Sequence, residues 1–201
     1  MRNVLVNLRR SALLSAVLLV SVFAYAYAGT GLSQLLFPHQ ANGSLGAYGS
    51  TLIGQNWTST RFFHGRPDDF GPYAADPKKG ISGGDNPLVA NGVPGESGPT
   101  NLGPRSETLL EDTRALVSWW HAHGVDPTPD LVTTSGSGLD PDITPADARA
   151  EVPMITHSTG IPAARLEALI RSQTHFEWGF LGSPYVDVLR LNESLARLEH
   201  R

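Results

Sequence analysis

The hydrophobic pattern of the chain begins with one long apolar run, Ser11 to Ala28, which holds no charged residue, glycine or proline. About 18 residues at roughly 1.5 Å each make a helix about 27 Å long, close to the thickness of a bilayer's hydrocarbon core. Apolar residues continue at helical spacing through Leu36 and Phe37 and stop at Pro38. The pattern therefore predicts a transmembrane helix over residues 11–37, with its core at 11–28.

The charges that flank this run predict its orientation. Arg2, Arg9 and Arg10 precede it, and the first acidic residue of the chain is Asp68. Basic residues beside an apolar span favour the cytoplasmic side of the membrane. We therefore expect residues 1–10 to be cytoplasmic and the chain beyond the span to lie outside.

A cleavable signal peptide is an alternative interpretation of the same run. Ala26-Tyr27-Ala28 before Gly29 fits the small-x-small cleavage rule. The product would then be a secreted binding domain, released by cleavage after Ala28, with Trp57, Phe62 and Phe63 as its ligand face. The run is longer than the usual 7–15-residue apolar core of a signal peptide and continues past Gly29, which favours an uncleaved anchor.

The rest of the chain mixes helical and extended patterns. Ser106 and the sequence Thr144-Pro145-Ala146-Asp147 are typical helix starts, and Gly124 is a typical helix stop. We predict helices over 106–123, from 144 with a limit or kink at Pro153, after Pro162, and over 191–198, and short strands over 51–57, 130–134 and 185–189. This order predicts a single N-terminal transmembrane helix plus one mixed α/β (α+β) extracytoplasmic domain over 38–201.

A long Gly/Pro-rich loop is predicted over residues 67–104. Seven prolines in this stretch exclude a long helix or a central strand. Its glycine-rich turn at 82–86 could cradle a phosphate with backbone N–H groups. The Walker pattern is absent and no helix start follows, so we interpret the turn as a plain loop.

Composition narrows the possible functions. Without its three N-terminal arginines the chain has twelve basic and nineteen acidic residues, a formal charge of −7. This balance argues against a nucleic-acid partner, which needs a basic surface. The chain has no cysteine, so thiol catalysis and cysteine–metal sites are excluded. His121 and His123 are two apart, which is wrong for a shared metal on a helix, and we expect no metal site.

One aromatic and basic cluster, Arg61-Phe62-Phe63 with Arg66, has two interpretations. Phe62 and Phe63 can pack in the core while Arg61 and Arg66 lie on the surface. Alternatively, all four are candidate partner contacts, since aromatic residues and arginine are the usual anchors of interfaces. No constellation of nucleophile, acid and base stands out, so we expect no catalytic residues.

Several motifs together resemble one family. They are Leu36-Phe37-Pro38 with Gln40-Ala41-Asn42-Gly43-Ser44, Leu52-Ile53-Gly54-Gln55-Asn56, Phe63-His64-Gly65-Arg66-Pro67, Gly71-Pro72-Tyr73, Ser82-Gly83-Gly84, Asn101-Leu102-Gly103-Pro104, the block Leu131 to Thr144, Phe180-Leu181-Gly182, Pro184 and Leu191-Asn192. In this order, behind one N-terminal span, they resemble the C subunit (KdpC family) of the Kdp-type potassium-transporting P-type ATPase. The resemblance covers nearly the whole chain.

The resemblance implies a non-catalytic accessory subunit of a high-affinity potassium uptake complex in the bacterial plasma (inner) membrane. Its partners would be a channel-like A subunit, a P-type ATPase B subunit and membrane lipid. ATP and potassium would be handled by the complex, with no cofactor of the chain's own. The family is described as a catalytic chaperone that raises the ATP affinity of the B subunit, with the residue matching Gln55 proposed as a nucleotide contact.

Topology conflicts with a direct nucleotide contact. The arginines predict that Gln55 lies outside, whereas ATP and the nucleotide domain of the B subunit lie inside. We therefore expect an indirect effect on ATP affinity, transmitted through membrane helices as a coupling free energy. A second hypothesis is that carboxylates of the long loop attract potassium electrostatically at the outer mouth of the complex. These carboxylates are Asp68, Asp69, Asp76 and Asp85.

Overall fold

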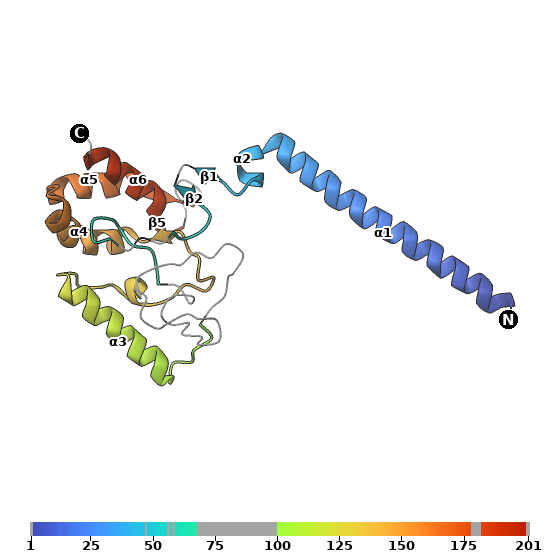
Figure 1. The fold of residues 1–201 in the computed structure, drawn as a ribbon, viewed down its shortest axis with the longest axis horizontal. Coiled ribbons are helices and arrows are strands. Elements are labelled where there is room, and N and C mark those ends of the chain that lie inside the picture. Colours follow the sequence, from blue (N-terminus) through green and yellow to red (C-terminus); the bar gives the residue numbers. More distant parts are fainter. Residues whose placement is uncertain are drawn as a thin grey trace. The chain divides into compact units, whose positions relative to one another are not determined.

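The structure, a computed structural model, describes residues 2–46, 48–55, 57, 59–67, 100–177 and 182–199 (Figure 1). The chain divides into two compact units, Met1–Leu45 and Gly46–Arg201. Most of the predicted loop over 67–104 lies outside the described residues, as do its glycine-rich turn at 82–86 and the four loop carboxylates.

The first unit consists of two helices, α1 (Arg2–Leu36) and the short α2 (Pro38–Ala41). The predicted N-terminal apolar helix is confirmed, although it starts earlier than the apolar run. Its Ser21 and Ser33 hydroxyls donate hydrogen bonds to carbonyl groups one turn earlier, so these two polar side chains are satisfied within the helix. Residues Asn3–Leu36 are long and apolar enough to cross a membrane.

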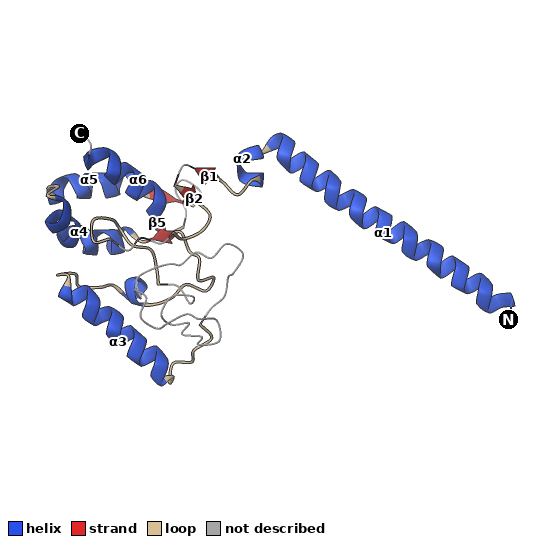
Figure 2. Cartoon of the chain, viewed as in Figure 1, coloured by secondary structure: helices blue, strands red, loops and turns tan. Residues whose placement is uncertain are grey.

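The second unit contains helices around a small antiparallel sheet (Figure 2). Its helices are α3 (Glu107–Ala122), the 3₁₀ turn η2 (Pro129–Val132), α4 (Pro145–Thr159), α5 (Ala163–Gln173) and α6 (Val188–Glu199). Its sheet has the order β3-β5-β4, from β3 (Asp142–Ile143), β4 (His175–Phe176) and β5 (Pro184–Asp187). A two-stranded ribbon, β1 (Leu45–Gly46) and β2 (Gly49–Ser50), lies at the boundary between the units in the sequence.

The predicted helix ends are confirmed by their capping geometry. Ser106 Oγ accepts a hydrogen bond from Leu109 N–H at the start of α3, and Gly124 follows its C-cap with a φ of 73°. Thr144 and Asp147 form a capping box at the start of α4, with donor–acceptor distances of 3.2 and 2.7 Å. These contacts are local, and for this reason the sequence pattern can predict them.

All three predicted strands, over 51–57, 130–134 and 185–189, need correction. Of the residues predicted as a strand over 130–134, the first three lie in η2 (Pro129–Val132) instead, because Pro129 opens a tight helical turn, and the last two belong to no strand. The described residues of 51–57 form no strand, and residues 51–53 form a turn and a bend. The strand predicted over 185–189 ends at Asp187, because its carboxylate accepts a hydrogen bond from Arg190 N–H at 2.8 Å and caps α6.

The helix that starts at Thr144 continues beyond Pro153, where we predicted a limit or kink. Pro153 lies on an exposed side of α4. There, water can satisfy the carbonyl group that has lost its N–H partner.

A hydrophobic core lies between α3, α4, α5, α6 and the inner face of the sheet. Ile143 and Val186 are register partners on β3 and β5 and supply the sheet's contribution. The largest fully buried apolar side chains are Trp120, Phe63, Leu116, Leu131, Ile155, Leu166, Ile170, Leu191 and Leu195. Phe63 belongs to a loop, so the core depends on that loop being held in place.

A buried hydrogen bond between a carboxyl group and an imidazole holds this loop against α4. Glu151 and His64 are both fully buried, and Glu151 Oε2 lies 2.7 Å from His64 Nδ1. The same carboxylate accepts the backbone N–H of His64 at 3.0 Å. Burial raises the pKa of Glu151, against the opposing effect of its hydrogen bonds with His64. The rings of Trp119 and Trp120 stand edge-on to the imidazole, with ring centroids 5.9 and 5.4 Å away.

A second buried contact joins the loop to α6. Asn192 Oδ1 accepts the N–H of Phe63 and Asn192 Nδ2 donates to the carbonyl group of Phe63, each at 2.8 Å. One side chain thus replaces the partners that a strand or helix would provide for this backbone. We call His64, Glu151, Asn192 and the Phe63 backbone the buried brace.

Replacing Asn192 with leucine tests the brace. Asn192→Leu keeps the side-chain volume but leaves the N–H and C=O of Phe63 buried without partners, each of which costs about 1–3 kcal/mol. We expect the free energy of unfolding to fall by about 2–4 kcal/mol, measured by urea denaturation of the full chain in detergent. The control is Glu193→Gln, which weakens a 3.9 Å surface contact with Arg197 and should change stability by less than about 0.5 kcal/mol. Equal stabilities of the two variants would contradict the role of the brace.

Candidate functional site

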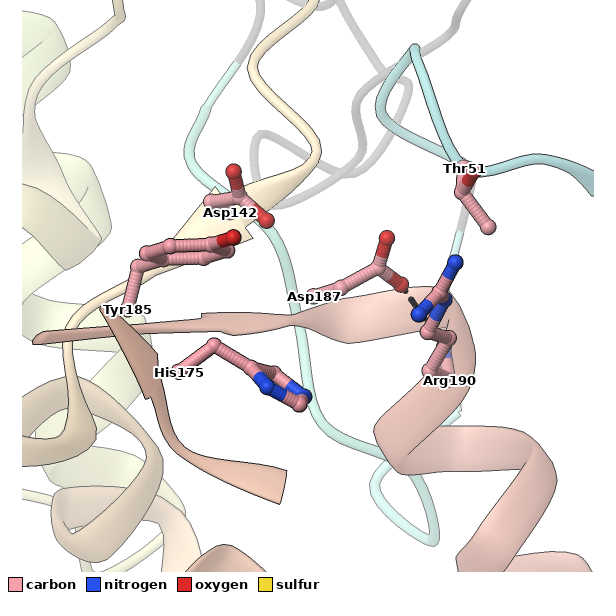
Figure 3. A pocket seen from close by; sticks show the side chains of 6 residues that line it. All are labelled: Thr51, Asp142, His175, Tyr185, Asp187 and Arg190. Atoms are coloured by element: carbon pink, nitrogen blue, oxygen red, sulfur yellow. Dashed lines mark hydrogen bonds between the residues drawn. The ribbon is translucent and has the colours of Figure 1, made fainter. Parts of the chain in front are cut away.

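A charged pocket opens on the outer face of the sheet (Figure 3). Its volume is about 230 Å³, and its lining is mostly polar or charged. The lining residues are Thr51, Asp142, His175, Tyr185, Asp187 and Arg190. They come from a turn, all three strands of the sheet and the first turn of α6.

Strand register brings four of these side chains together. Asp142 of β3 is the register partner of Asp187 on β5, and His175 of β4 is the partner of Tyr185 on β5. Tyr185 and Asp187 are two residues apart on one strand and therefore project from the same face. Val186 between them faces the core. The rings of His175 and Tyr185 lie 6.0 Å apart.

Both carboxyl groups of the facing pair, Asp142 and Asp187, have raised pKa values. Partial burial, together with the nearby charges of Asp140 and Asp187, raises the pKa of Asp142 to about 6. Burial also raises the pKa of Asp187, against the opposing effect of the hydrogen bond from Arg190 N–H. Like charges directly opposite on neighbouring strands repel. The pocket therefore places two carboxyl groups that repel each other when ionised beside a guanidinium, an imidazole and a phenol. Groups of these kinds can bind charged or polar partners.

A second pocket, of about 170 Å³, shares Asp142 and Tyr185 with the first. Arg66 lines it and donates to the carbonyl group of Thr134 at 3.1 Å. The Arg66 guanidinium also lies 3.6 Å from Asp130. Among the described residues no group of three or more His, Asp or Glu side chains has an arrangement that could hold a metal ion.

The structure gives each candidate partner contact a position within the chain. Phe63 is fully buried in the core, and Phe62 is partly buried with its ring 5.1 Å from that of Trp57. Arg61 donates to Glu199 at 2.8 Å and to the carbonyl group of Ser158. These positions match the core-packing interpretation of the two phenylalanines. Contact of the partly exposed members with a partner stays a prediction.

Gln55 does not line the charged pocket. It lies in the turn that follows β2, and its amide donates hydrogen bonds to the carbonyl groups of Ser50 and Ile53. A role for Gln55 as a nucleotide contact stays a prediction.

The sequence interpretation did not single out Asp142, His175 or Arg190 as site residues. The alternation of Tyr185 and Asp187 along a predicted strand was a usable signal for two members of the pocket. The other members join them only through strand pairing and the direction of α6, which no local pattern encodes.

The raised pKa of Asp142 predicts a pH dependence of stability. Its folded-state pKa of about 6 lies above the ordinary 3.8, so the stabilisation from its protonated form is complete below about pH 4 and is lost as pH rises through 6. The neutral variant Asp142→Asn should gain about 1 kcal/mol at about pH 7.5, after allowing for solvent screening, and should show a flatter profile between pH 4 and 7. Urea denaturation at a series of pH values measures both effects.

The control for this prediction is Asp126→Asn, at a fully exposed carboxylate that lies only near His121. Its profile should follow that of the unmodified chain. A profile for Asp142→Asn as steep as that of the unmodified chain would contradict the assignment.

Comparisons with known proteins identify the family. The family model KdpC, described as the K+-transporting ATPase c chain, matches residues 8–197. Three curated relatives are named as potassium-transporting ATPase KdpC subunits. That of Methylobacterium nodulans is 42% identical, over 91% of this chain and 92% of its own length. The relative from Nostoc sp. is 39% identical over 90% of both chains, and that of Methylorubrum populi is 40% identical over 94% and 95%. This chain therefore belongs to the KdpC family and is a subunit of a potassium-transporting ATPase.

Proposed function

We propose that this chain is a non-catalytic accessory subunit of an ATP-driven potassium uptake complex, anchored in the bacterial plasma membrane by α1. The observation that carries the proposal is the apolar window of α1, none of which is buried within the chain. A helix that is apolar all round needs either a core or a membrane to cover it. The compact unit Gly46–Arg201, with its own core, lies outside the membrane in this proposal.

The three N-terminal arginines support the proposed orientation. Arg9 and Arg10 lie in the first turns of α1, and no acidic residue offsets them before Asp68. Their charges favour a cytoplasmic N-terminus. Because α1 continues without a break through Ala28 and Gly29 to Leu36, the helix gives no structural support to release by cleavage at that position.

The partners in this proposal are the channel-like A subunit, which binds potassium, and the P-type ATPase B subunit, which hydrolyses ATP. The chain raises the ATP affinity of the B subunit indirectly, as a coupling free energy through packed membrane helices. It needs no cofactor of its own. The proposal rests on family membership together with the N-terminal arginines, which favour a compact unit on the side opposite the cytoplasmic nucleotide domain.

Purification from native membranes tests the assembly. The chain, tagged at its C-terminus and extracted in mild detergent, should retain two large multispanning chains, one with a P-type ATPase phosphorylation motif. Mass spectrometry identifies them, and membranes that carry the tag on an unrelated single-span protein are the control. A lone soluble product that begins at Gly29 would overturn the proposal and support the secreted binding domain.

Cysteine accessibility tests the orientation, since the chain has no cysteine of its own. Thr108→Cys lies on an exposed side of α3, and Val4→Cys lies near the start of α1. In spheroplasts a membrane-impermeant maleimide should label the first variant at once and the second only after permeabilisation. The opposite order of labelling would contradict the proposed topology.

A further inference from the structure

The side-chain amide of Gln55 is used inside its own turn. Gln55 Nε2 donates to the carbonyl group of Ser50 at 3.1 Å and to that of Ile53 at 3.2 Å. A glutamine amide has two hydrogens to donate, and two carbonyl groups receive them here. The side chain therefore bridges the start and the end of the turn that follows β2.

Gly49 leaves the space that the side-chain amide of Gln55 occupies. A Cβ atom built on Gly49 would lie 2.6 Å from Gln55 Oε1 and 2.8 Å from its amide carbon, closer than real side chains approach. The φ of Gly49 is +135°, a value that residues with a Cβ rarely adopt. Gly49 and Gln55 thus form a matched pair in which the missing side chain leaves room for the amide.

Further hydrogen bonds hold the turn to the rest of the unit. Ser50 Oγ accepts the N–H of Leu52 at 3.0 Å, and Gly54 N–H donates to the carbonyl group of Leu139 at 2.8 Å. Leu139 precedes β3, so the turn is tied to the segment that leads into the charged pocket. The amide of Gln55 adds its two hydrogen bonds to these contacts.

The turn from Gly49 to Gln55 positions two side chains. Thr51 lines the charged pocket, where Figure 3 shows it beside Arg190. Leu52 is 57% exposed, although it is a large apolar residue. The shape of the turn therefore sets the position of Thr51 in the lining of the pocket and the position of the exposed Leu52 side chain.

We infer that Gln55 is a positioning residue that holds the turn from Gly49 to Gln55 in the shape in which this subunit acts on its transporter, and that it is not a nucleotide ligand. The inference rests on the proposed function as an accessory subunit. A nucleotide could receive the amide hydrogens only if the carbonyl groups of Ser50 and Ile53 lost them. The loss would remove the contacts that shape the turn.

Three single variants separate the two roles. Gln55→Glu has the same shape but replaces the two donors with an oxygen that repels the carbonyl groups. Gly49→Ala leaves the glutamine unchanged, yet its methyl group occupies the space of the amide. Gly46→Ala is the matched control in the same ribbon, because its Cβ would meet only Gly49 O at an ordinary 3.6 Å.

The experiment measures the KM for ATP of the purified complex at saturating potassium, together with amide hydrogen exchange of Leu52 and Gly54. We expect Gln55→Glu and Gly49→Ala to raise the KM by the same factor, about fivefold, and to speed exchange at both amides. Unchanged exchange in α5 shows that the fold is intact. Gly46→Ala should match the unmodified complex in both measurements.

Two results would overturn the inference. If Gln55→Glu raises the KM while Gly49→Ala leaves it unchanged, then the glutamine acts directly on the nucleotide. If neither variant changes the KM, the shape of the turn has no part in the activity. A complex whose KM is the same with and without the unmodified chain would instead overturn the proposed function. In that case hydrogen exchange at Leu52 and Gly54 would still show whether Gln55 holds the turn.

Discussion

Glu151 is the constraint on which the second unit depends. A carboxylate removed from water needs hydrogen-bond donors of its own, and here the imidazole and the backbone N–H of His64 supply them. The loop that holds His64 has no helix or sheet of its own, so its backbone groups depend on side chains of α4 and α6. Through this contact a loop that would otherwise be loose brings Phe63 into the core.

The same arrangement determines where the charged pocket forms. Asn192 ties α6 to the loop, and α6 continues directly from β5, whose last residue, Asp187, caps the helix. The helix therefore begins at a defined point, and Arg190 in its first turn lies beside the carboxylates of the sheet. A buried contact on one side of the unit thus sets the electrostatics of the opposite face of β5.

The two units differ in where their apolar side chains lie. In α1, apolar side chains remain exposed along the whole helix, as expected of a segment whose solvent is lipid. In the second unit the buried apolar side chains that the structure describes converge on a hydrophobic core. Membership of the KdpC family connects the two, since a subunit of a membrane transporter needs both an anchor and a surface for interaction.

Much of this architecture follows from local rules. The apolar run predicts α1, and Ser106, Thr144, Asp147 and Gly124 mark helix ends, because capping and helical periodicity depend on residues only a few positions apart. The ordered motifs also identify the family. The sequence by itself therefore determined the anchor, most of the helices and the kind of protein.

Tertiary structure alone decided the rest. The register that sets Asp142 against Asp187, the pairing of His64 with Glu151 and the use of the Gln55 amide within its turn all depend on backbone positions set by contacts elsewhere in the unit. Local patterns specify where an element begins and ends, whereas the partner of a buried polar group is known only once the chain has folded around it.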